Sequence, residues 1–153
     1  ERSRGLGDVY KRQIIDLPLF PKKLLSELVL LVDDNEDNIE TYSSYLKEEG
    51  YQIEIAQNGL KAFNLAKEMQ PKLILMDIQM PQVDGLTAIR MIRANNLNMP
   101  IIALTALAMS EDREKCLNAG ANEYVSKPVP LKKLTKLIQK YLPTNFTQTK
   151  NNE

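Results

Sequence analysis

Hydrophobic residues in this chain gather in short runs that are separated by longer stretches of mixed polarity. The runs Glu27–Val32 (ELVLLV), Lys72–Met76 (KLILM) and Pro100–Leu104 (PIIAL) have the length of strands. Continuous apolar runs are typical of strands that are covered on both faces, as in a parallel sheet. Gln52–Ile55, which alternates polar and apolar residues, and Glu123–Val125, which is short, are typical of strands at the edges of a sheet.

Each run is followed by a stretch with apolar residues at helical spacing. Asn58 is placed to cap the second of these helices, which ends before Pro71, and Gly50 is placed to stop the first. The fourth helix, from Ser110 to Gly120, carries few large apolar residues, so we expect it to be the loosest part of the fold. The apolar faces of the other helices are formed by Ile39, Tyr42 and Leu46; by Leu60, Phe63 and Met69; by Leu86, Ile89 and Ile92; and, after Pro130, by Leu131, Leu134, Leu137, Ile138, Tyr141 and Leu142.

Five strand–helix units in succession predict the α/β class, with a doubly wound five-stranded parallel sheet. Because the second and fifth strands are the weakest, they are expected at the edges, which gives the strand order 2-1-3-4-5. This is the flavodoxin-like (βα)5 arrangement, in which ligands bind beyond the carboxyl ends of the strands.

Composition limits the classes of protein that remain. The 153 residues suffice for one domain, and the formal net charge of +0 gives no global attraction to nucleic acid or to an anionic membrane. No apolar run approaches the length of a membrane span, and no secretory leader pattern is present, so we expect a cytoplasmic location. The single cysteine, Cys116, excludes an internal disulfide. The absence of histidine removes Ser-His-Asp and Cys-His catalysis and His-ligated metals.

Polar residues with chemical potential stand where the predicted strands end. Asp33 and Asp34 end the first strand, Asp77 the third, Thr105 the fourth and Lys127 the fifth. Three neighbouring carboxylates repel one another, and Mg²⁺, a hard cation with oxygen ligands, relieves that repulsion. A metal, a lysine and a hydroxyl around one carboxylate form a site for phosphoryl transfer, in which Asp77 is the nucleophile.

Each of these residues also has an ordinary structural interpretation. An aspartate after a strand is most often a helix cap or a turn former, and a threonine at a strand end is usually a β-forming residue. Lys127 alone is typical of a solvated surface charge, and Pro128 alone of a strand terminator. The ordinary interpretations do not account for the joint placement of these residues at the ends of successive strands.

Four segments carry a resemblance to a known family. They are Leu30–Asn35 (LLVDDN), Leu75–Pro81 (LMDIQMP) with Asp84-Gly85 after it, Ala103–Ala106 (ALTA) and Ala119–Pro128 (AGANEYVSKP). Together they resemble the receiver domain of response regulators over about residues 27–142. The resemblance implies a phosphoacceptor that receives its phosphoryl group from the phosphohistidine of a histidine kinase or histidine phosphotransfer domain.

The resemblance also implies a role for each matching residue. Asp77 is expected to be the phosphoacceptor, with Mg²⁺ (or Mn²⁺ in its place) held by Asp34 directly, by Asp33 through water, by Asp77 and by the backbone carbonyl of Gln79. Thr105 and Tyr124 are expected to be the switch residues. Lys127 is expected to bind the phosphoryl oxygens, and the Lys127–Pro128 peptide bond is expected to be cis. Gln79 and Leu107 are expected to tune hydrolysis of the aspartyl phosphate. Output partners are expected at the face made by the fourth helix, the fifth strand and the fifth helix.

The two ends of the chain are expected to lie outside this domain. Residues 8–13 match the translation of a sequencing-adaptor end, so residues 1–13 are expected to be non-native and unstructured. Residues 143–153 are expected to form a disordered tail. Residues 14–26 resemble the last strand of a kinase ATP-binding domain followed by a linker. The expected parent is therefore a hybrid sensor histidine kinase, which could be membrane-anchored, with this receiver at its C-terminus. The chain itself is expected to catalyse only its own phosphorylation and dephosphorylation.

Other classes of protein fit less well. A haloacid-dehalogenase-like phosphohydrolase also uses an aspartate and Mg²⁺, but it carries a second aspartate two residues later, where this chain has Gln79. A flavodoxin needs a phosphate-binding loop after the first strand, and the acidic residues there would repel a phosphate. A P-loop nucleotidase is excluded because this chain has no Gly-Lys-Ser/Thr loop.

Overall fold

The computed structural model describes residues 27–106 and 109–142, in which strands and helices alternate. The predicted segments 1–13, 14–26 and 143–153, as well as Leu107, lie outside the described residues. In chain order the elements are β1 (Leu28–Val32), α3 (Glu36–Glu48), β2 (Gln52–Ala56), α4 (Gly59–Met69), β3 (Leu73–Asp77), α5 (Gly85–Ala94), β4 (Ile101–Thr105), α6 (Ser110–Ala119), β5 (Glu123–Ser126) and α7 (Leu131–Tyr141).

The sheet is parallel and has the order β2-β1-β3-β4-β5, so the predicted fold class and strand order are confirmed. The two strands with the weakest apolar pattern are the edge strands. The three inner strands are almost entirely buried, which explains their continuous apolar sequences. Each inner strand ends one residue later than its apolar run, except β1, and Asp77 and Thr105 are therefore the last residues of β3 and β4.

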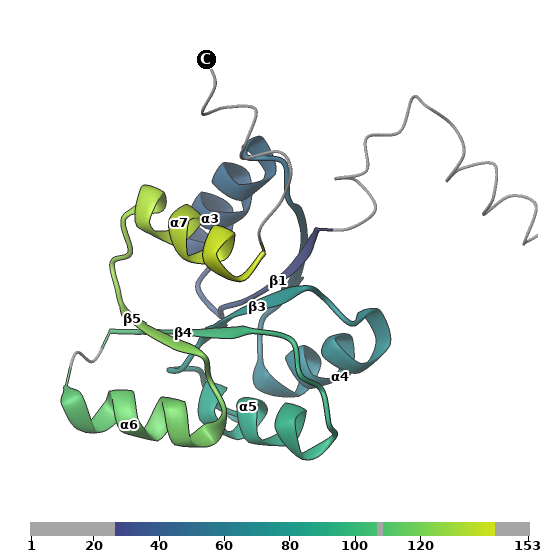
Figure 1. The fold of residues 1–153 in the computed structure, drawn as a ribbon, viewed down its shortest axis with the longest axis vertical. Coiled ribbons are helices and arrows are strands. Elements are labelled where there is room, and N and C mark those ends of the chain that lie inside the picture. The colour runs from purple at the N-terminus through teal and green to yellow at the C-terminus, as the bar shows by residue number, and fades with distance from the viewer. Residues whose placement is uncertain (1–26, 107–108, 143–153) are drawn as a thin grey trace, which may run out of the picture.

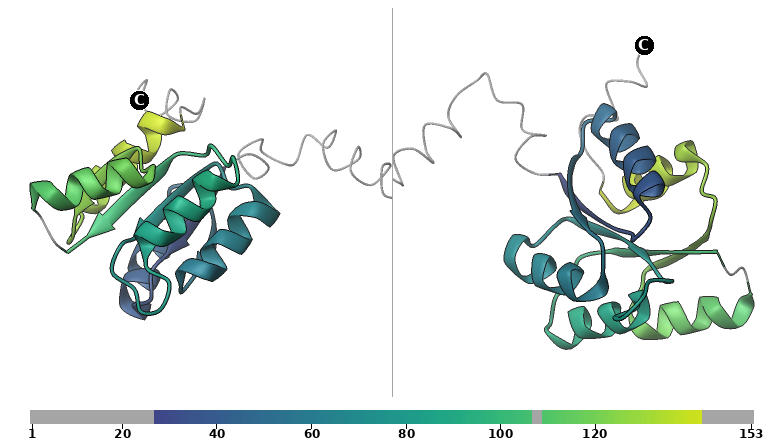
Figure 2. Two further views of the ribbon diagram at one scale, coloured as in Figure 1. Left: turned by 90° about the horizontal axis from the view of Figure 1, so that it is seen from below. Right: turned by 180° about the vertical axis from the view of Figure 1, so that it is seen from behind.

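Two helical layers cover the sheet, as Figure 1 shows and the turned views of Figure 2 repeat. The helices α3 and α7 lie on one face, where Leu46, Leu134 and Ile138 pack against the sheet without exposure to solvent. The helices α4, α5 and α6 lie on the other face, where Ile89 and Ile92 of α5 are equally buried. Burial of the apolar faces on both sides of the sheet is the main source of stability for such a fold. Among the described helices, none is long and apolar enough to cross a membrane.

Three helices begin with a side-chain cap that the sequence supplies. Asn35, Asn58 and Asp84 accept hydrogen bonds from the backbone N–H three residues later, which satisfies a donor that the helix itself leaves free. The helix α6 is different because its N-cap is Met109, which has no side-chain oxygen, and Ser110 is already its first helical residue. Only Cys116 and Ala119 of α6 are buried, which agrees with its few apolar residues.

The amino edge of the sheet, where the strands begin, is tied together by Arg93 at the end of α5. Its guanidinium donates to the carbonyl oxygens of Leu97 and Gly120 at 2.7 and 2.9 Å and to Asn122 Oδ1 at 3.0 Å. The Asn122 side chain also accepts from the backbone N–H of Ile101, the first residue of β4. Arg93 therefore joins the carboxyl ends of α5 and α6 to the start of β4.

The last turn of α7 is fastened to the same edge. The Tyr141 hydroxyl lies within hydrogen-bonding distance of two acceptors, Glu123 Oε1 at 3.0 Å and the Asn122 carbonyl oxygen at 3.3 Å, and Lys140 pairs with Glu123 at 2.7 Å. These contacts hold the pKa of the Glu123 carboxyl below its usual range, chiefly through the Lys140 hydrogen bond. The helix α7 therefore runs from the carboxyl edge of the sheet back to its amino edge.

Candidate functional site

The carboxyl ends of the strands bring the predicted polar residues to one edge of the sheet. Asp33 follows β1 directly, Asp77 and Thr105 end β3 and β4, and Lys127 follows β5. Asp33, Asp77 and Thr105 are no more than 3% exposed, although all three carry polar side chains. Because burying polar groups costs free energy unless they have partners, their contacts decide what this edge can do.

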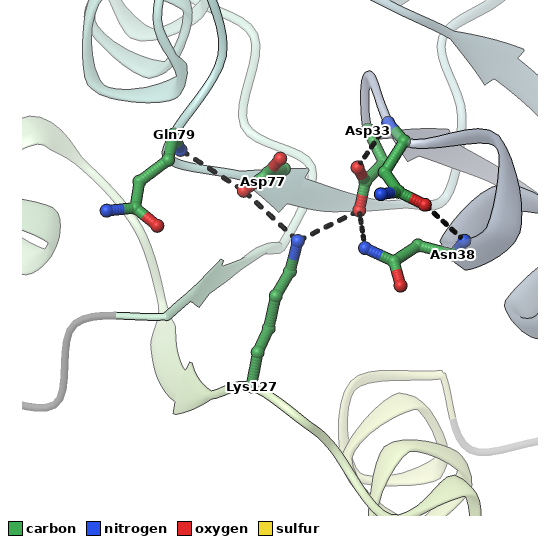
Figure 3. A network of polar contacts seen from close by, with 6 residues as sticks. Asp33, Asn38, Asp77, Gln79 and Lys127 are labelled. Atoms are coloured by element: carbon green, nitrogen blue, oxygen red, sulfur yellow. Dashed lines mark hydrogen bonds and ion pairs between the residues drawn. The ribbon is translucent and has the colours of Figure 1, made fainter.

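Asp33 is held by donors on both of its carboxylate oxygens, as Figure 3 shows. Its Oδ1 accepts the backbone N–H of Asn35 at 2.9 Å. Its Oδ2 accepts the Nδ2 of Asn38 at 3.3 Å and the Nζ of Lys127 at 2.9 Å. The start of α3 and the end of β5 thus meet on one buried carboxylate.

Lys127 lies between two acidic side chains (Figure 3). Its Nζ is 2.9 Å from Asp33 Oδ2 and 3.2 Å from Asp77 Oδ1. The hydrogen bond and charge of Asp33, followed by the charge of Asp77, raise the pKa of Lys127 even though burial opposes this. Lys127 is therefore a stable positive charge directly beside the Asp77 carboxylate.

Asp77 is the acid that its environment affects most. Burial raises its pKa to about 6, and the charge of Asp33 adds to the rise, while Lys127 and the backbone N–H of Gln79 oppose it. The Gln79 N–H donates to Asp77 Oδ1 at 3.1 Å. A carboxylate whose charge is poorly solvated is stabilised by any cation that reaches it, and it is also a reactive nucleophile.

Asp33, Asp34 and Asp77 form the metal-compatible cluster of the described residues. One carboxylate oxygen from each lies within 4.8 Å of the others. Asp34 is exposed, so the cluster opens to solvent on its side, while the other two acids are buried. Oxygen donors alone, with access for water, match the preference of Mg²⁺. The donor set therefore fits this ion.

The loop after β3 approaches the Asp77 backbone very closely. A side chain on Gly85 would overlap the carbonyl oxygen of Asp77, and the Gly85 N–H donates to the Ile78 carbonyl at 3.2 Å. Asp84 caps α5 at the same point. The Asp84-Gly85 pair thus closes the loop that carries Gln79, because only glycine fits the second position.

Thr105 and Tyr124 lie on neighbouring strands at and near this edge. Thr105 pairs with Ser126 in the register of β4 and β5, and its carbonyl accepts the Lys127 N–H at 2.7 Å. Tyr124 is half-buried and packs against the core on the α4–α5–α6 face. The Lys127–Pro128 peptide bond is cis.

The structure adds Asn38, whose role the sequence patterns did not indicate. Its side chain reaches back from the first turn of α3 to Asp33. The spacing from Asn35 to Asn38 is that of a helix cap and its third helical residue, and this spacing was the available sign that the Asn38 side chain points backwards. Gln79 is exposed, and only its backbone N–H is engaged with Asp77.

Comparison with known proteins agrees with this geometry. The family model for the response regulator receiver domain matches residues 29–139. The polar-differentiation response regulator DivK of Brucella anthropi is 38% identical over 116 residues, which cover 74% of this chain and 94% of DivK. The chain therefore belongs to the response regulator receiver domain family.

Solved structures show the same likeness. The receiver domain of the sensor histidine kinase PA1611 from Pseudomonas aeruginosa, with a magnesium ion in its active site cleft, is 38% identical; the match covers 78% of this chain and 99% of that one, with a TM-score of 0.72. The receiver domain of Ssk1 from Saccharomyces cerevisiae, solved with the histidine phosphotransfer protein Ypd1, is 34% identical. That match covers 76% of this chain and 88% of the other, with a TM-score of 0.73.

Proposed function

We propose that this domain accepts a phosphoryl group on Asp77 in a Mg²⁺-dependent reaction and passes the change on through Thr105 and Tyr124. The observation that carries the proposal is the position of Lys127, which bridges Asp33 and Asp77 beside a metal-compatible acidic cluster. A nucleophilic carboxylate, a fixed positive charge and a cation site are the parts that phosphoryl transfer requires.

The chain's own residues supply the nucleophile and part of the charge stabilisation. An Asp77 carboxylate oxygen attacks the phosphorus, the new P–O bond forms, and the bond to the donor breaks with its electron pair left on the donor. Lys127 is already within 3.2 Å of Asp77 Oδ1 and can pair with the phosphoryl oxygens there. Thr105, at the end of the adjacent strand, supplies a hydroxyl. The N–H of Gln79 orients the Asp77 carboxylate.

Mg²⁺ fits the acidic cluster, and the residues proposed to hold it are Asp34 directly, Asp33 through water, Asp77, and the backbone carbonyl of Gln79. When bound, the ion neutralises the negative charge on the phosphoryl oxygens. Support comes from the three carboxylates within 4.8 Å and from the magnesium ion in the PA1611 receiver. Mn²⁺ is proposed as a substitute.

The conformational response is proposed to run through Thr105, Tyr124 and α6. Phosphorylation adds negative charge and acceptor oxygens that attract the Thr105 hydroxyl, and the space that Thr105 leaves admits Tyr124. With only two buried residues, α6 is the described helix that can shift at least cost. The output surface is accordingly proposed at the face formed by α6, β5 and α7.

The phosphoryl donor is proposed to be a phosphohistidine of a histidine kinase or a histidine phosphotransfer domain. The complex of the Ssk1 receiver with Ypd1 supports this donor class. The likeness to the receiver of a sensor histidine kinase supports a hybrid kinase as the parent protein. A cytoplasmic location is proposed for the receiver. Gln79 and Leu107 are proposed to tune the hydrolysis of the aspartyl phosphate, and no direct contact with nucleic acid or membrane is proposed.

The direct test is intact-mass measurement after incubation of the full chain with Mg²⁺ and acetyl phosphate. We expect a gain of one phosphoryl group, about 80 Da, that EDTA and Asp77→Asn both abolish. Asp84→Asn, which keeps the cap on α5, is the control for loss of an acid near the site. A folded wild-type protein that binds Mg²⁺ but never gains mass would reject the proposal.

The haloacid-dehalogenase-like alternative predicts a different result. An enzyme of that class releases phosphate from a substrate over many turnovers, whereas a receiver holds one phosphoryl group per chain. Phosphate release from a phosphate monoester such as p-nitrophenyl phosphate, measured beside the intact mass, separates the two, because a receiver that loses its phosphoryl group by hydrolysis can release phosphate repeatedly from acetyl phosphate. Gln79→Asp, which places an acid two residues after Asp77, is expected to alter the lifetime of the phosphorylated form without producing turnover of phosphate monoesters.

A further inference from the structure

The contacts of Asn38 suggest a task that none of the proposed roles covers. Asp33 Oδ2 has two donors, Asn38 Nδ2 at 3.3 Å and Lys127 Nζ at 2.9 Å, and the aspartate is only 1% exposed. Bulk solvent therefore hardly reaches this oxygen, and apart from the water proposed to link Asp33 to Mg²⁺, a donor that leaves it is replaced only from within the protein. Leaving a buried charged acceptor with fewer donors is costly, so a second protein donor on Oδ2 offsets part of that cost when Lys127 changes partner.

Phosphoryl transfer gives Lys127 a new partner. Before the reaction its ammonium is shared between Asp33 and Asp77. During transfer the developing charge lies on phosphoryl oxygens at Asp77, so the ammonium is drawn to them and away from Asp33. Asn35 cannot compensate, because its N–H donates to the other oxygen, Oδ1. Asn38 is the donor that stays on Oδ2.

We propose that Asn38 is a positioning residue for phosphoryl transfer: its amide keeps the Asp33 carboxylate bonded and in place while Lys127 moves to the phosphoryl group. This inference rests on the proposed function and deepens it. The contribution is larger in the transition state than in the resting protein, where Lys127 still serves Asp33, so Asn38 affects the rate of transfer more than binding.

The position of Asn38 on α3 makes this role possible. Its backbone N–H donates to Asn35 Oδ1 at 3.0 Å, which fixes the first turn of the helix. In an ordinary capping box the side chain of this third helical residue would return to the N–H of the cap. Here the cap's N–H is already bonded to Asp33, and the Asn38 side chain reaches past it to the same carboxylate. The start of α3 thus holds Asp33 through two hydrogen bonds, one to each carboxylate oxygen.

The test compares Asn38→Leu, which keeps the approximate size and removes the donor, with Asn38→Gln, which keeps an amide. Asn64→Leu is the matched control, because Asn64 is an exposed residue of α4. For each protein three quantities are measured: the phosphorylation rate against acetyl phosphate concentration at saturating Mg²⁺, the Mg²⁺ Kd by calorimetry without donor, and the urea unfolding curve.

We expect Asn38→Leu to lower the plateau rate about tenfold, with the Mg²⁺ Kd and the half-saturating acetyl phosphate concentration changed by less than about threefold. Asn38→Gln should recover most of the rate, and Asn64→Leu should match the wild type. A plateau rate in Asn38→Leu close to the wild-type value, or a parallel loss of rate, Mg²⁺ affinity and stability, would overturn the inference. A wild-type chain that takes no phosphoryl group would instead reject the proposed function itself.

Discussion

Single residues at the carboxyl edge show how neighbours decide the behaviour of a side chain. Asp33 and Asp77 are similarly buried, but only Asp33 accepts donors on both of its oxygens from protein groups that the structure describes. Asp77 has Lys127 and the Gln79 N–H on Oδ1, and burial remains the largest influence on its pKa. Among the described residues Asp77 has fewer hydrogen-bonding partners than Asp33, and Asp77 is the acid proposed to react.

A residue far from this edge offers a test of how burial affects ionisation. Burial, with smaller contributions from Glu27 and Glu49, raises the pKa of Tyr51 from 10.0 to about 12. The folded protein therefore keeps this proton more tightly than the unfolded chain. Its contribution to stability is complete below pH 10 and is lost as the pH rises toward 12.

The prediction for Tyr51→Phe is a changed alkaline dependence of stability. Since phenylalanine does not ionise, the wild type should lose about 1 kcal/mol more unfolding free energy than the variant between pH 9 and pH 11. Urea unfolding of both proteins at the two pH values gives the comparison, with Tyr45→Phe as a control on a half-buried tyrosine. Equal losses in wild type and Tyr51→Phe would contradict the effect of burial.

The types of residue at the predicted strand ends were sufficient to predict which side chains gather at the carboxyl edge of the sheet, because the carboxyl ends of parallel strands lie at the same edge. They were not sufficient to find the partners of those side chains. Asn38 was missed because its contact with Asp33 depends on the side-chain direction in the first turn of α3, which a pattern of apolar residues does not contain. The sharing of Lys127 between two acids likewise depends on atomic distances.

At the level of elements, α6 is held very differently at its two ends. Its first turn lacks a side-chain cap, whereas the carbonyl of Gly120, just after its last residue, accepts from Arg93. The weak apolar pattern predicts a loose helix, and in the structure the contact with Arg93 lies at the carboxyl end of α6. The sequence could not reveal this, because Arg93 and Gly120 are far apart along the chain.

Hydrogen exchange can measure this asymmetry. We expect amides near the end of α6 to exchange more slowly than those near its start, since opening of the last turn breaks the Arg93 contacts. Arg93→Ala should reduce the difference and lower the unfolding free energy by about 2–3 kcal/mol, because two carbonyls lose this donor and Asn122 Oδ1 loses one of its two donors. Arg90→Ala, at an exposed position of the same helix, is the control. Unchanged exchange in Arg93→Ala would exclude this anchoring role.

For the whole molecule, the candidate site carries a cost in stability. The pKa of Asp77 in the metal-free protein is about 6, above its usual 3.8, so the folded state binds this proton more tightly than the unfolded state. The associated stability is complete below about pH 4 and is lost as the pH rises through about 6. At neutral pH the charged Asp77 therefore destabilises the metal-free fold.

Asp77→Asn should accordingly be more stable than the wild type at pH 7.5 without metal, by about 1–3 kcal/mol. The difference should shrink toward zero at pH 4, and saturating Mg²⁺ should reduce it at pH 7.5 by stabilising the wild type. Chemical unfolding at the two pH values, with and without Mg²⁺, measures each part. A variant that is less stable than the wild type at pH 7.5 would show that the Lys127 ion pair outweighs burial.

The fastening of α7 to the amino edge of the sheet has a consequence for how this fold can be used. Since β1 begins at that edge and Tyr141 is bonded beside the start of β5, the described fold both opens and closes on the side away from the acidic cluster. Polypeptide fused before Glu27 or after Leu142 would leave from the far side of the molecule. Other modules could therefore be joined at both ends of this unit while the edge that carries the proposed phosphoacceptor stays open to a donor.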